Sequence, residues 1–577
     1  MVAEGYSQKN AIYAPMADMT LRDCWHASLA ANPDKTAVID AQGMSLNYGE
    51  VDLLASRIAR YLADCGINTL DIVSCQLPGW VEFLPIYVAC LKLGAVINPI
   101  PPNLRYNELK HILTACGSKV LFVPRRFKKM AYCEMAVRLR KVVESLRVVV
   151  AVDKTGEGSV LPTYRDVVEE DVGSPMLQAE SDALVRAGHI CPDSLAALVF
   201  TSGSEGQPKG VMLSHRNIIF AETSFAAFFH IHSDDIMFMP APIAHATGFH
   251  HGVSMPFIMG ATSVLLDVFK APAALELIKA RKCTVTMAAT PFLYDLVQTI
   301  QQGGEYDYSS LRFFLCGGSP PNVPLSRTAE QLGFRVLNVY GSTESVPHMG
   351  TPLTPVSAAM DSLALCPMPG IRVRVVDRQG RDVADGEEGE EISCSPAVFM
   401  GYLREPEMTA KVLQRDGWAH SGDLSRRNAD GTYSITGWLK DIIVRGGENI
   451  SSLAVENVLL QHPKVKDAAV VGMPDERLQE RICAFVVLHD KADALTFQEV
   501  FDFFLTQDIA KQKFPEHLEI LDEMPRTSSG KVRKTLLRQW IAQEISTGIC
   551  AKLPMQCKRC VATTSTAAAP KLISQNL

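Results

Sequence analysis

A short apolar segment, Leu195–Phe200, passes directly into a polar stretch rich in glycine and serine, Thr201–Gly210. An apolar run of this length that is bounded by turn-forming residues predicts a buried strand. Backbone amides without bulky side chains can approach anionic oxygens closely, and Lys209 adds a positive charge. The pattern predicts a loop that holds a polyphosphate, with a flexible surface loop as the alternative. It is not a Walker A loop, because the Gly-Lys-Ser/Thr ending is missing.

Strand-like and helix-like segments alternate along most of the chain, which predicts a fold of α/β layers. Helices are predicted at Glu50–Cys65 and Val81–Leu93. Further strands are predicted at Ile72–Leu77, Val148–Val152, Thr262–Leu266, Thr284–Ala288 and Phe313–Cys316. Around Ile371–Tyr402 the sequence changes to short strands with Asp/Gly turns, which is typical of a small β-rich subdomain.

Beyond this β-rich region the sequence predicts a compact α+β unit, with a helix at Leu453–Gln461 and a strand at Ala468–Val471. We therefore expect a large N-terminal domain of residues 1–439 and a small mobile C-terminal domain of residues 440–545. Residues 546–577 are rich in Ala and Thr and are expected to form a disordered tail.

Composition excludes several classes of protein. At 577 residues the chain is too long for one hydrophobic core, and its net charge of −7 gives no reason to expect a nucleic-acid partner. Residues 1–19 lack the basic and apolar regions of a signal peptide, and no apolar run approaches the roughly 18 residues of a membrane span. The 15 cysteines are scattered, which suits a cytoplasmic protein with reduced thiols. Peripheral membrane contact stays open.

Four further clusters carry side chains suited to nucleotide chemistry. Asn338–Glu344 puts an aromatic ring, hydroxyls and a carboxylate on one predicted turn, where they could stack a base, touch a phosphate and hold Mg²⁺. Cys316–Pro320 ends a predicted strand, where α/β sheets bind ligands. Gly417–Asp423 offers a carboxylate that can accept both ribose hydroxyls, and Pro525–Lys531 carries a lysine that could stabilise charge on a phosphate. Each alone is also typical of an ordinary turn or a solvated lysine.

Together and in this order, the clusters resemble the adenylate-forming superfamily of acyl-CoA synthetases, peptide-synthetase adenylation domains and beetle luciferases. The resemblance covers about residues 20–545. Four segments are similar to the short- to medium-chain fatty acyl-CoA synthetases of enteric bacteria, which serve anaerobic β-oxidation: Gln76–Trp80, Ala241–Phe249, Phe313–Gly318 and Lys440–Ile450.

This resemblance implies a ligase that joins a short- to medium-chain fatty acid to coenzyme A, with ATP and CoA as co-substrates and Mg²⁺ as cofactor. In the family, the large domain binds ATP and acid while the small domain moves over it. The first step joins the carboxylate to the α-phosphate of ATP and releases pyrophosphate. In the second step the thiol of CoA attacks the acyl-adenylate and releases AMP.

The resemblance also implies residue roles. Lys531 would bridge the substrate carboxylate and the α-phosphate in the first step only, Thr343 would contact the α-phosphate, and Glu344 would hold Mg²⁺. Tyr340 would frame the adenine and Asp423 the ribose. The remaining residues implied to bind ATP are Thr201, Ser202, Gly203, Ser204, Gly206, Lys209, Gly317 and Gly318.

Further positions are implied for the acyl group, CoA and domain movement. His245 would border the acyl pocket, and Gly446 and Gly447 would line the pantetheine tunnel, where a side chain would obstruct the thiol. Lys440 matches the hinge. Three aromatic residues are candidate walls of the acyl pocket, with plain core packing as the alternative: Phe249, Phe292 and Tyr294.

Two positions depart from the family pattern. Glu205 stands in the phosphate loop where most relatives have Thr or Ser, and we expect its carboxylate to point away from the polyphosphate. Trp438 stands where relatives normally carry an Arg that hydrogen-bonds the ribose, which predicts weaker nucleotide binding.

Two other functions stay open. One is an enzyme that adenylates an acid but passes the acyl group to a carrier protein; no carrier domain with an Asp-Ser attachment motif is evident. The other, suggested by Trp438, is a catalytically weakened protein that binds an acyl nucleotide. The preferred acyl chain length within the short to medium range and the oligomeric state are not predicted.

Overall fold

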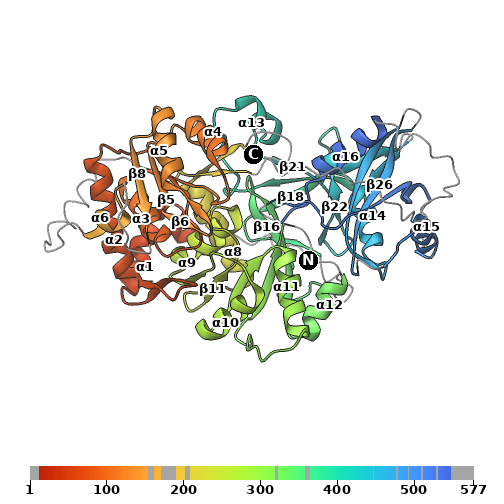
Figure 1. Ribbon diagram of the computed structural model, residues 1–577, viewed down its shortest axis with the longest axis horizontal. Coiled ribbons are helices and arrows are strands. Elements are labelled where there is room, and N and C mark those ends of the chain that lie inside the picture. The colour runs from red at the N-terminus through yellow and green to blue at the C-terminus, as the bar shows by residue number, and fades with distance from the viewer. Residues whose placement is uncertain are drawn as a thin grey trace. The chain divides into compact units, whose positions relative to one another are not determined.

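The computed structural model describes residues 12–153, 161–169, 190–201, 208–318, 323–357, 364–445, 448–475, 478–490, 493–507, 511–527 and 530–546 (Figure 1). The chain divides into two compact units. The large unit comprises Met1–Lys440 and Arg526–Val532, and the small unit comprises Asp441–Pro525 and Arg533–Leu577. The loop that carries Lys531 thus belongs to the large unit, although it lies in the predicted C-terminal domain.

One sheet of the large unit has seven strands in the order β20-β10-β9-β4-β3-β5-β8. Pairing is parallel from β9 to β8 and antiparallel on both sides of β10. The strands are β3 (Ile72–Cys75), β4 (Val96–Pro99), β5 (Val120–Pro124), β8 (Val148–Val152), β9 (Leu195–Phe200), β10 (Gly210–Ser214) and β20 (Gly401–Tyr402).

The second sheet has nine strands in the order β17-β16-β15-β14-β13-β11-β12-β1-β2. Its centre, from β15 to β1, is parallel, and both ends are antiparallel. The strands are β1 (Thr36–Asp40), β2 (Ser45–Asn47), β11 (Ile236–Met239), β12 (Thr262–Leu265), β13 (Val285–Ala288), β14 (Phe313–Gly317), β15 (Val336–Ser342), β16 (Val346–Gly350) and β17 (Cys366–Pro367).

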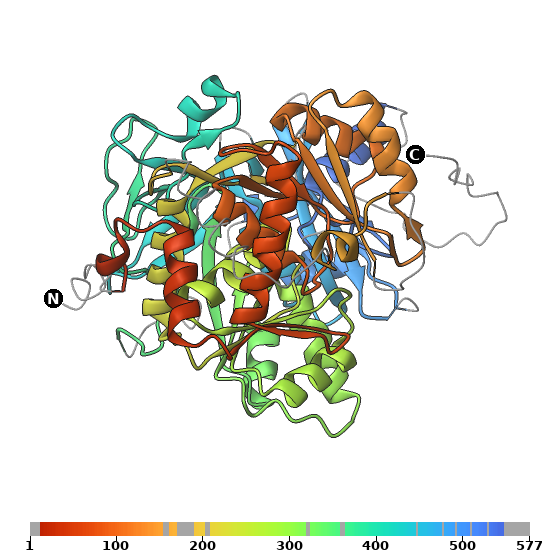
Figure 2. The ribbon, with the colours of Figure 1, turned by 90° about the vertical axis from the view of Figure 1, so that its left-hand side faces the viewer.

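Alternation along the buried strands assigns side chains to separate layers. In β14, Phe313 and Leu315 join the central core, whereas Phe314 and Cys316 join a second core. This second core lies under the outer helices α10 (Ala271–Arg281), α11 (Thr290–Gln301) and α12 (Val323–Gln331). Helix α8 (His215–Phe229) is buried on almost every side and contacts strands of both sheets. The layers are therefore outer helices, a sheet, central helices, a second sheet and further outer helices (Figure 2).

The helices of the large unit complete this architecture, with α4 and α5 packed on β5 and β8 (Figure 1). They are η2 (Ala14–Met16), α1 (Leu21–Ala31), α2 (Tyr48–Asp64), α3 (Phe83–Leu93), α4 (Tyr106–Cys116), α5 (Cys133–Val142), α6 (Tyr164–Glu169), α8 (His215–Phe229), η3 (Gly248–Ser254), α9 (Met255–Met259), α10 (Ala271–Arg281), α11 (Thr290–Gln301), α12 (Val323–Gln331) and α13 (Pro406–Val412).

The predicted β-rich region, around Ile371–Tyr402, contributes β18 and β19 to an antiparallel sheet of the large unit with the order β18-β19-β21-β22, and β21 and β22 lie beyond the predicted region. Its strands are β18 (Arg372–Val376), β19 (Glu388–Cys394), β21 (Ala419–Arg427) and β22 (Tyr433–Trp438). A short hairpin elsewhere in the unit comprises β6 (Arg126–Phe127) and β7 (Met130–Ala131), and η4 (Leu439–Asp441) follows β22.

The small unit has its own sheet and its own hydrophobic core. Strands β24-β23-β26-β25 pair antiparallel, and β27 adds to β26 in parallel. The elements are β23 (Ile442–Arg445), β24 (Glu448–Ser451), α14 (Ser452–Leu459), β25 (Val465–Asp475), β26 (Gln479–Leu488), α15 (Phe497–Leu505), η5 (Lys511–Lys513), β27 (His517–Ile520) and α16 (Lys534–Ser546).

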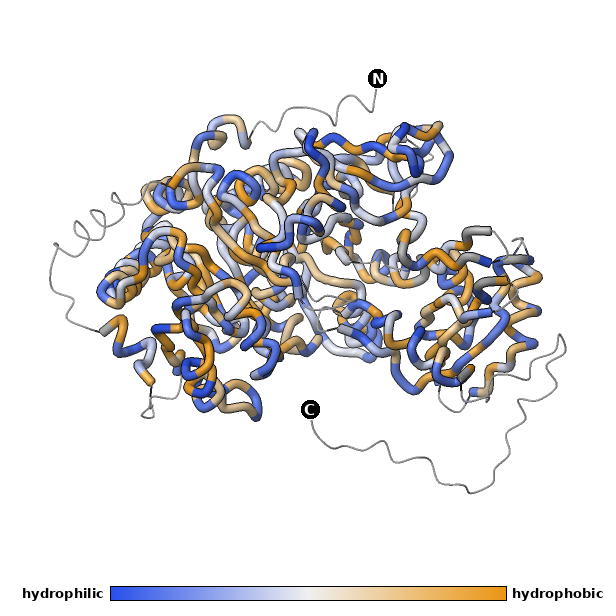
Figure 3. Tube along the Cα trace, turned by 90° about the horizontal axis from the view of Figure 1, so that it is seen from above, coloured by the Kyte–Doolittle hydropathy of each residue, from blue (hydrophilic) through white to orange (hydrophobic). Residues whose placement is uncertain are grey.

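Hydrophilic and hydrophobic residues are interspersed along the trace (Figure 3). Within the described part of the chain, no helix combines the length and the hydropathy that crossing a membrane requires.

Candidate active site

The predicted phosphate loop joins β9 to β10, and the structure describes its two ends. The backbone N–H of Thr201 donates to the carbonyl oxygen of Lys209 at 3.0 Å, which closes the base of the loop. The intervening candidates, Ser202, Gly203, Ser204 and Gly206, lie outside the described residues, as does Glu205.

Glu344 lies in the turn after β15, close to the end of this loop. Its Oε1 accepts a hydrogen bond of 2.7 Å from the hydroxyl of Tyr402 in β20. The ammonium of Lys209 lies 5.3 Å from the centre of the same aromatic ring. Tyr402 therefore links two predicted site residues, and the sequence analysis missed it. Burial, with a smaller contribution from Glu344, raises the pKa of this phenol, which keeps it a hydrogen-bond donor.

The cluster Asn338–Glu344 was expected on one turn, and this part of the prediction is wrong. Residues up to Ser342 belong to β15, and Thr343 and Glu344 follow it. The reversal needs the glycine before Ser342, because a Cβ on Gly341 would lie 2.3 Å from the carbonyl oxygen of Val346.

Tyr340 and Asp423, which the sequence assigned separately to adenine and ribose, meet in the structure. The hydroxyl of Tyr340 donates to Oδ2 of Asp423 at 2.7 Å. Tyr340 lies in β15 of the nine-stranded sheet and Asp423 in β21 of the four-stranded sheet. Burial, followed by the charges of Glu391 and Asp423, raises the pKa of this phenol well above its ordinary value. The neutral phenol of Tyr340 therefore donates from the nine-stranded sheet to the carboxylate of Asp423 in the four-stranded sheet.

Gly317 ends β14, and Gly318 follows with a φ of +87°, in the region that favours glycine. A Cβ on Gly318 would lie 3.9 Å from Cε of Lys531. The Lys531 loop is a small hairpin, since Arg526 and Val532 form an antiparallel bridge. The structure therefore brings the predicted catalytic lysine next to the predicted adenine-binding glycines within the large unit.

His245 and Phe249 lie on either side of the start of η3. Nδ1 of His245 accepts from the backbone N–H of Thr247 at 3.3 Å. Burial, and to a smaller extent the charge of Lys531, lowers the pKa of His245 to about 4. The imidazole is therefore neutral at pH 7. Phe249 is fully buried with its ring centre 5.2 Å from that of Tyr87. The segment from Gly248 is a π-helix, a form that is frequent at functional sites.

The other aromatic candidates lie on α11. Phe292 packs edge-to-face on Phe269 with ring centres 4.7 Å apart, and both Phe292 and Tyr294 are partly buried beside the outer core. This agrees with the alternative of plain core packing, and the acyl-wall role stays a prediction.

The backbone of Lys440 lies in η4, where the large unit ends. In the β21–β22 ladder, Trp438 is the direct partner of Asp423, so the position of the missing arginine lies opposite the predicted ribose ligand. Gly446 and Gly447 lie outside the described residues.

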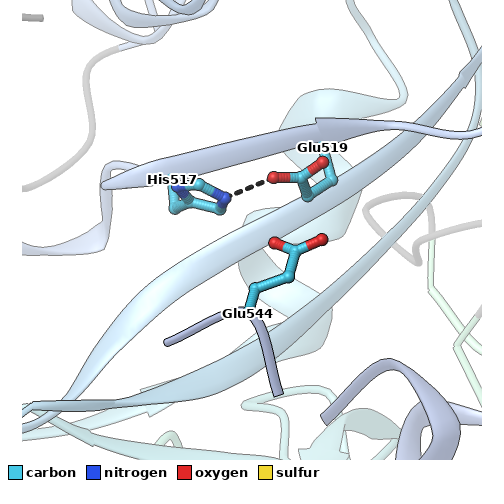
Figure 4. Close-up of side chains that lie close together, drawn as sticks. All are labelled: His517, Glu519 and Glu544. Carbon is cyan, nitrogen blue, oxygen red and sulfur yellow. Dashed lines mark hydrogen bonds and ion pairs between the residues drawn. The ribbon is translucent and has the colours of Figure 1, made fainter. Parts of the chain in front are cut away.

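A group of three metal-ligating side chains lies in the small unit, in β27 and α16 (Figure 4). Nε2 of His517 is 2.5 Å from Oε1 of Glu519, and Glu544 points toward the same carboxylate. Burial and the charge of Glu519 raise the pKa of Glu544, although His517 opposes this. The trio belongs to the small unit, whereas Glu344 belongs to the large unit. The hydrogen bond between His517 and Glu519 accounts for part of this cluster without a metal.

Two family models cover most of the chain. The model described as AMP-binding enzyme matches residues 25–403, and the one described as AMP-binding enzyme C-terminal domain matches residues 454–531. The chain belongs to the AMP-binding enzyme family. The predicted resemblance to adenylate-forming enzymes is confirmed.

Similar proteins agree with this assignment. The medium-chain fatty-acid–CoA ligase of Escherichia coli K12 is 44% identical over 539 residues, which is 93% of each chain. A feruloyl-CoA synthase of Amycolatopsis is 30% identical over 88% of this chain and 96% of its own. Among solved structures, ATP-bound MatB of Rhodopseudomonas palustris matches with a TM-score of 0.79 at 26% identity, over 91% of this chain and 99% of its own. The predicted α/β fold class is confirmed.

Proposed function

We propose that this protein is an AMP-forming ligase that joins a short- to medium-chain fatty acid to coenzyme A through an acyl-adenylate. The observation that carries the proposal is the meeting of separately predicted residues: Lys531 beside Gly318, and Tyr340 bonded to Asp423. The identity of 44% with a medium-chain fatty-acid–CoA ligase supports the substrate class.

In the first step, the base of the phosphate loop at Thr201 and Lys209 holds the outer phosphates of ATP. Lys531 then bridges the carboxylate of the fatty acid and the α-phosphate, where negative charge develops. Thr343 contacts the same phosphate. Tyr340 and Asp423 hold the adenosine, and the bare backbone at Gly317 and Gly318 leaves room for a planar base.

Mg²⁺ fits the donor set at Glu344. Carboxylate and hydroxyl oxygens lie at this turn, and one carboxylate together with substrate phosphates and water is a usual Mg²⁺ environment. Oε1 of Glu344 is oriented by the hydroxyl of Tyr402 at 2.7 Å, which fixes the carboxylate. The ion would supply positive charge that offsets the charge of the phosphates.

In the second step, a change in φ and ψ at Lys440 reorients the small domain, and Gly446 and Gly447 admit the pantetheine arm of CoA. His245, neutral at pH 7, borders the acyl pocket and presents no charge to an apolar chain. The scattered cysteines suit a reducing compartment, and we place the enzyme in the cytoplasm.

The deciding assay offers purified protein Mg·ATP with a series of straight-chain acids from short to medium length. Pyrophosphate, AMP and acyl-CoA are followed separately, with and without CoA. We expect CoA-dependent acyl-CoA that peaks at one chain length. Pyrophosphate without thioester would indicate a carrier-protein acceptor, and neither product would indicate a binding protein.

Restoring the family's arginine, by the change Trp438→Arg, is expected to lower the KM for ATP. A charge-assisted hydrogen bond contributes about 1.5–3 kcal/mol, which corresponds to roughly a ten- to hundredfold change in affinity. The backbone register supports this, because position 438 lies opposite Asp423. Steady-state kinetics with varied ATP test the expectation, and an unchanged KM would contradict it.

A further inference from the structure

Behind the Tyr340–Asp423 bond lies a second pair of polar residues, His348 and Glu391, which are 1% and 0% exposed. Nε2 of His348 is 3.1 Å from Oε1 of Glu391. The two residues come from β16 of the nine-stranded sheet and β19 of the four-stranded sheet, so the pair joins the same two sheets as the Tyr340–Asp423 bond. Burying an ion pair in this way is expensive, so a role other than stability has to be considered.

His348 stands at an irregularity of its strand. The β15–β16 register passes from the pair Tyr340–Met349 directly to Gly341–Pro347, which leaves His348 as the extra residue. A bulge of this kind turns a side chain in a direction that the regular pleat does not allow.

Glu391 faces a second irregularity. Leu424 of β21 opposes the residue before Glu391, and His420 opposes the residue after it. The intervening residues of β21, which end in Asp423, therefore lie opposite Glu391 alone. Two bulges thus deliver the buried pair and the predicted ribose ligand to one place.

Hydrogen bonds connect Glu391 to Tyr340 and Asp423, the two residues proposed to bind the adenosine. The hydroxyl of Tyr340, which donates to Asp423, also lies 3.3 Å from Oε2 of Glu391. Ser421 donates its hydroxyl to the backbone oxygen of Glu391 at 2.7 Å and accepts from the N–H of Asp423 at 3.0 Å. Because a phenol has one proton to share between two carboxylates, the position of Glu391 decides where the ring and its hydroxyl lie.

The contacts of His348 favour the protonated ring. Nδ1 is 3.1 Å from the carbonyl oxygen of Val346, which can only accept, and 3.1 Å from the hydroxyl of Ser345. Nε2 is 3.1 Å from a carboxylate oxygen of Glu391, which attracts a proton on this side of the ring. Burial lowers the pKa of His348, but Glu391 and, to a smaller extent, Asp423 raise it above its ordinary value. The imidazolium offsets the buried charge of Glu391 beneath the phenol.

We propose that His348 and Glu391 are positioning residues, which hold Tyr340 and Asp423 in the orientation that binds the adenosine of ATP. The proposal rests on the proposed function for the role of Tyr340 and Asp423. Neither His348 nor Glu391 needs to touch the nucleotide. Removing one member leaves an uncompensated charge beside the phenol and frees the ring to move.

Glu391→Gln and His348→Gln keep side chains of suitable size and remove the charge. We expect the Kd for Mg·ATP of the full chain, measured by calorimetry, to rise roughly tenfold in each variant, as for a lost charged hydrogen bond. The KM for ATP should rise in parallel while kcat at saturating ATP stays near the wild-type value. Asp385→Asn is the control, because it removes an ion pair at the surface. The side chain of Asp385 is 50% exposed and that of its partner Arg427 is 43% exposed.

A pH series separates positioning from general structure. The imidazolium is present below the raised pKa of His348 and is lost as the pH rises through it. The titratable groups that face His348 are Glu391, Asp423 and Tyr340, and the pKa of the phenol is raised well above its ordinary value. We therefore expect the Kd for Mg·ATP of the wild type to rise as the pH rises through the raised pKa of His348, and His348→Gln to lose this dependence.

Single variants that bind Mg·ATP like the wild type would overturn the proposal. If a single variant does not fold, the double variant His348→Gln with Glu391→Gln removes both charges together; we expect a recovered Tm with weak ATP binding. Recovery of both would mean that the pair only stabilises the fold. A wild type that binds Mg·ATP but makes no acyl-CoA would contradict the proposed function alone, since the Kd still tests the pair.

Discussion

Replacing Lys531 with alanine is expected to slow acyl-adenylate formation by roughly 10²–10³-fold, the usual effect of removing a group that stabilises developing charge. The ammonium group lies on the hairpin next to Gly318, at the end of β14. Its charge already acts in this region, because it helps to lower the pKa of His245 to about 4. The side chain is exposed, so its removal leaves no buried cavity.

The second half-reaction gives the decisive comparison. Thioester formation from synthetic acyl-adenylate and CoA should proceed at the wild-type rate in Lys531→Ala. In this step the bond between the carboxylate and the α-phosphate already exists, and AMP is the leaving group. Pyrophosphate release measures the first step and acyl-CoA the second. Lys513→Ala, an exposed lysine of the small unit, is the matched control. Adenylation within a few-fold of the wild type, or an equal loss in both steps, would contradict the assignment.

The sequence predicted the layers of the fold well because buried strands have a direct signature. Leu195–Phe200 and Val148–Val152 were predicted with the bounds that the structure shows for β9 and β8. Helix starts were less certain where every residue is apolar. The helix predicted from Val81 begins at Phe83, because Val81 and Glu82 form a turn instead, and the N–H of Phe83 donates to the carbonyl oxygen of Trp80 at 3.2 Å.

The site was predicted only as separate residues, and the contacts between them could not be. Tyr340 and Asp423 are 83 residues apart and Glu344 and Tyr402 are 58 apart, so no local pattern reports their hydrogen bonds. The motifs identified the candidate site residues, and the topology of the sheets explains how these residues come into contact.

His348 and Glu391 escaped prediction for another reason. A histidine and a glutamate within strands are typical of ordinary exposed positions, and both become buried here because bulges redirect the strands. A bulge is defined by the pairing of two strands, so its position cannot be predicted from the sequence of either strand alone.

Replacing Asp441 with asparagine is expected to destabilise the small unit by about 3 kcal/mol, as when one partner of a buried ion pair is removed. Asp441 is 7% exposed. Its two carboxylate oxygens lie 2.6 Å from Arg538 and 3.3 Å from Lys534, both in α16. The residue directly follows Lys440, the predicted hinge. Because Asp441 is anchored to α16, a backbone rotation at Lys440 would move the small unit as one body, and the variant should therefore also slow the second half-reaction.

Acid provides the check on the electrostatic cause. Burial raises the pKa of Asp441, but Lys534 and Arg538 lower it below its ordinary value. The ion pairs therefore stabilise the unit above the ordinary aspartate pKa of about 3.9, and this stabilisation is lost as the pH falls through the lowered pKa.

Hydrogen exchange of β23 and β26 in urea should show a large difference between the variant and the wild type at pH 7 that shrinks in acid. Glu499→Gln, which removes the exposed pair with Lys464, should change stability by less than about 1 kcal/mol. Equal effects of the two changes would mean that Asp441 is not an anchor.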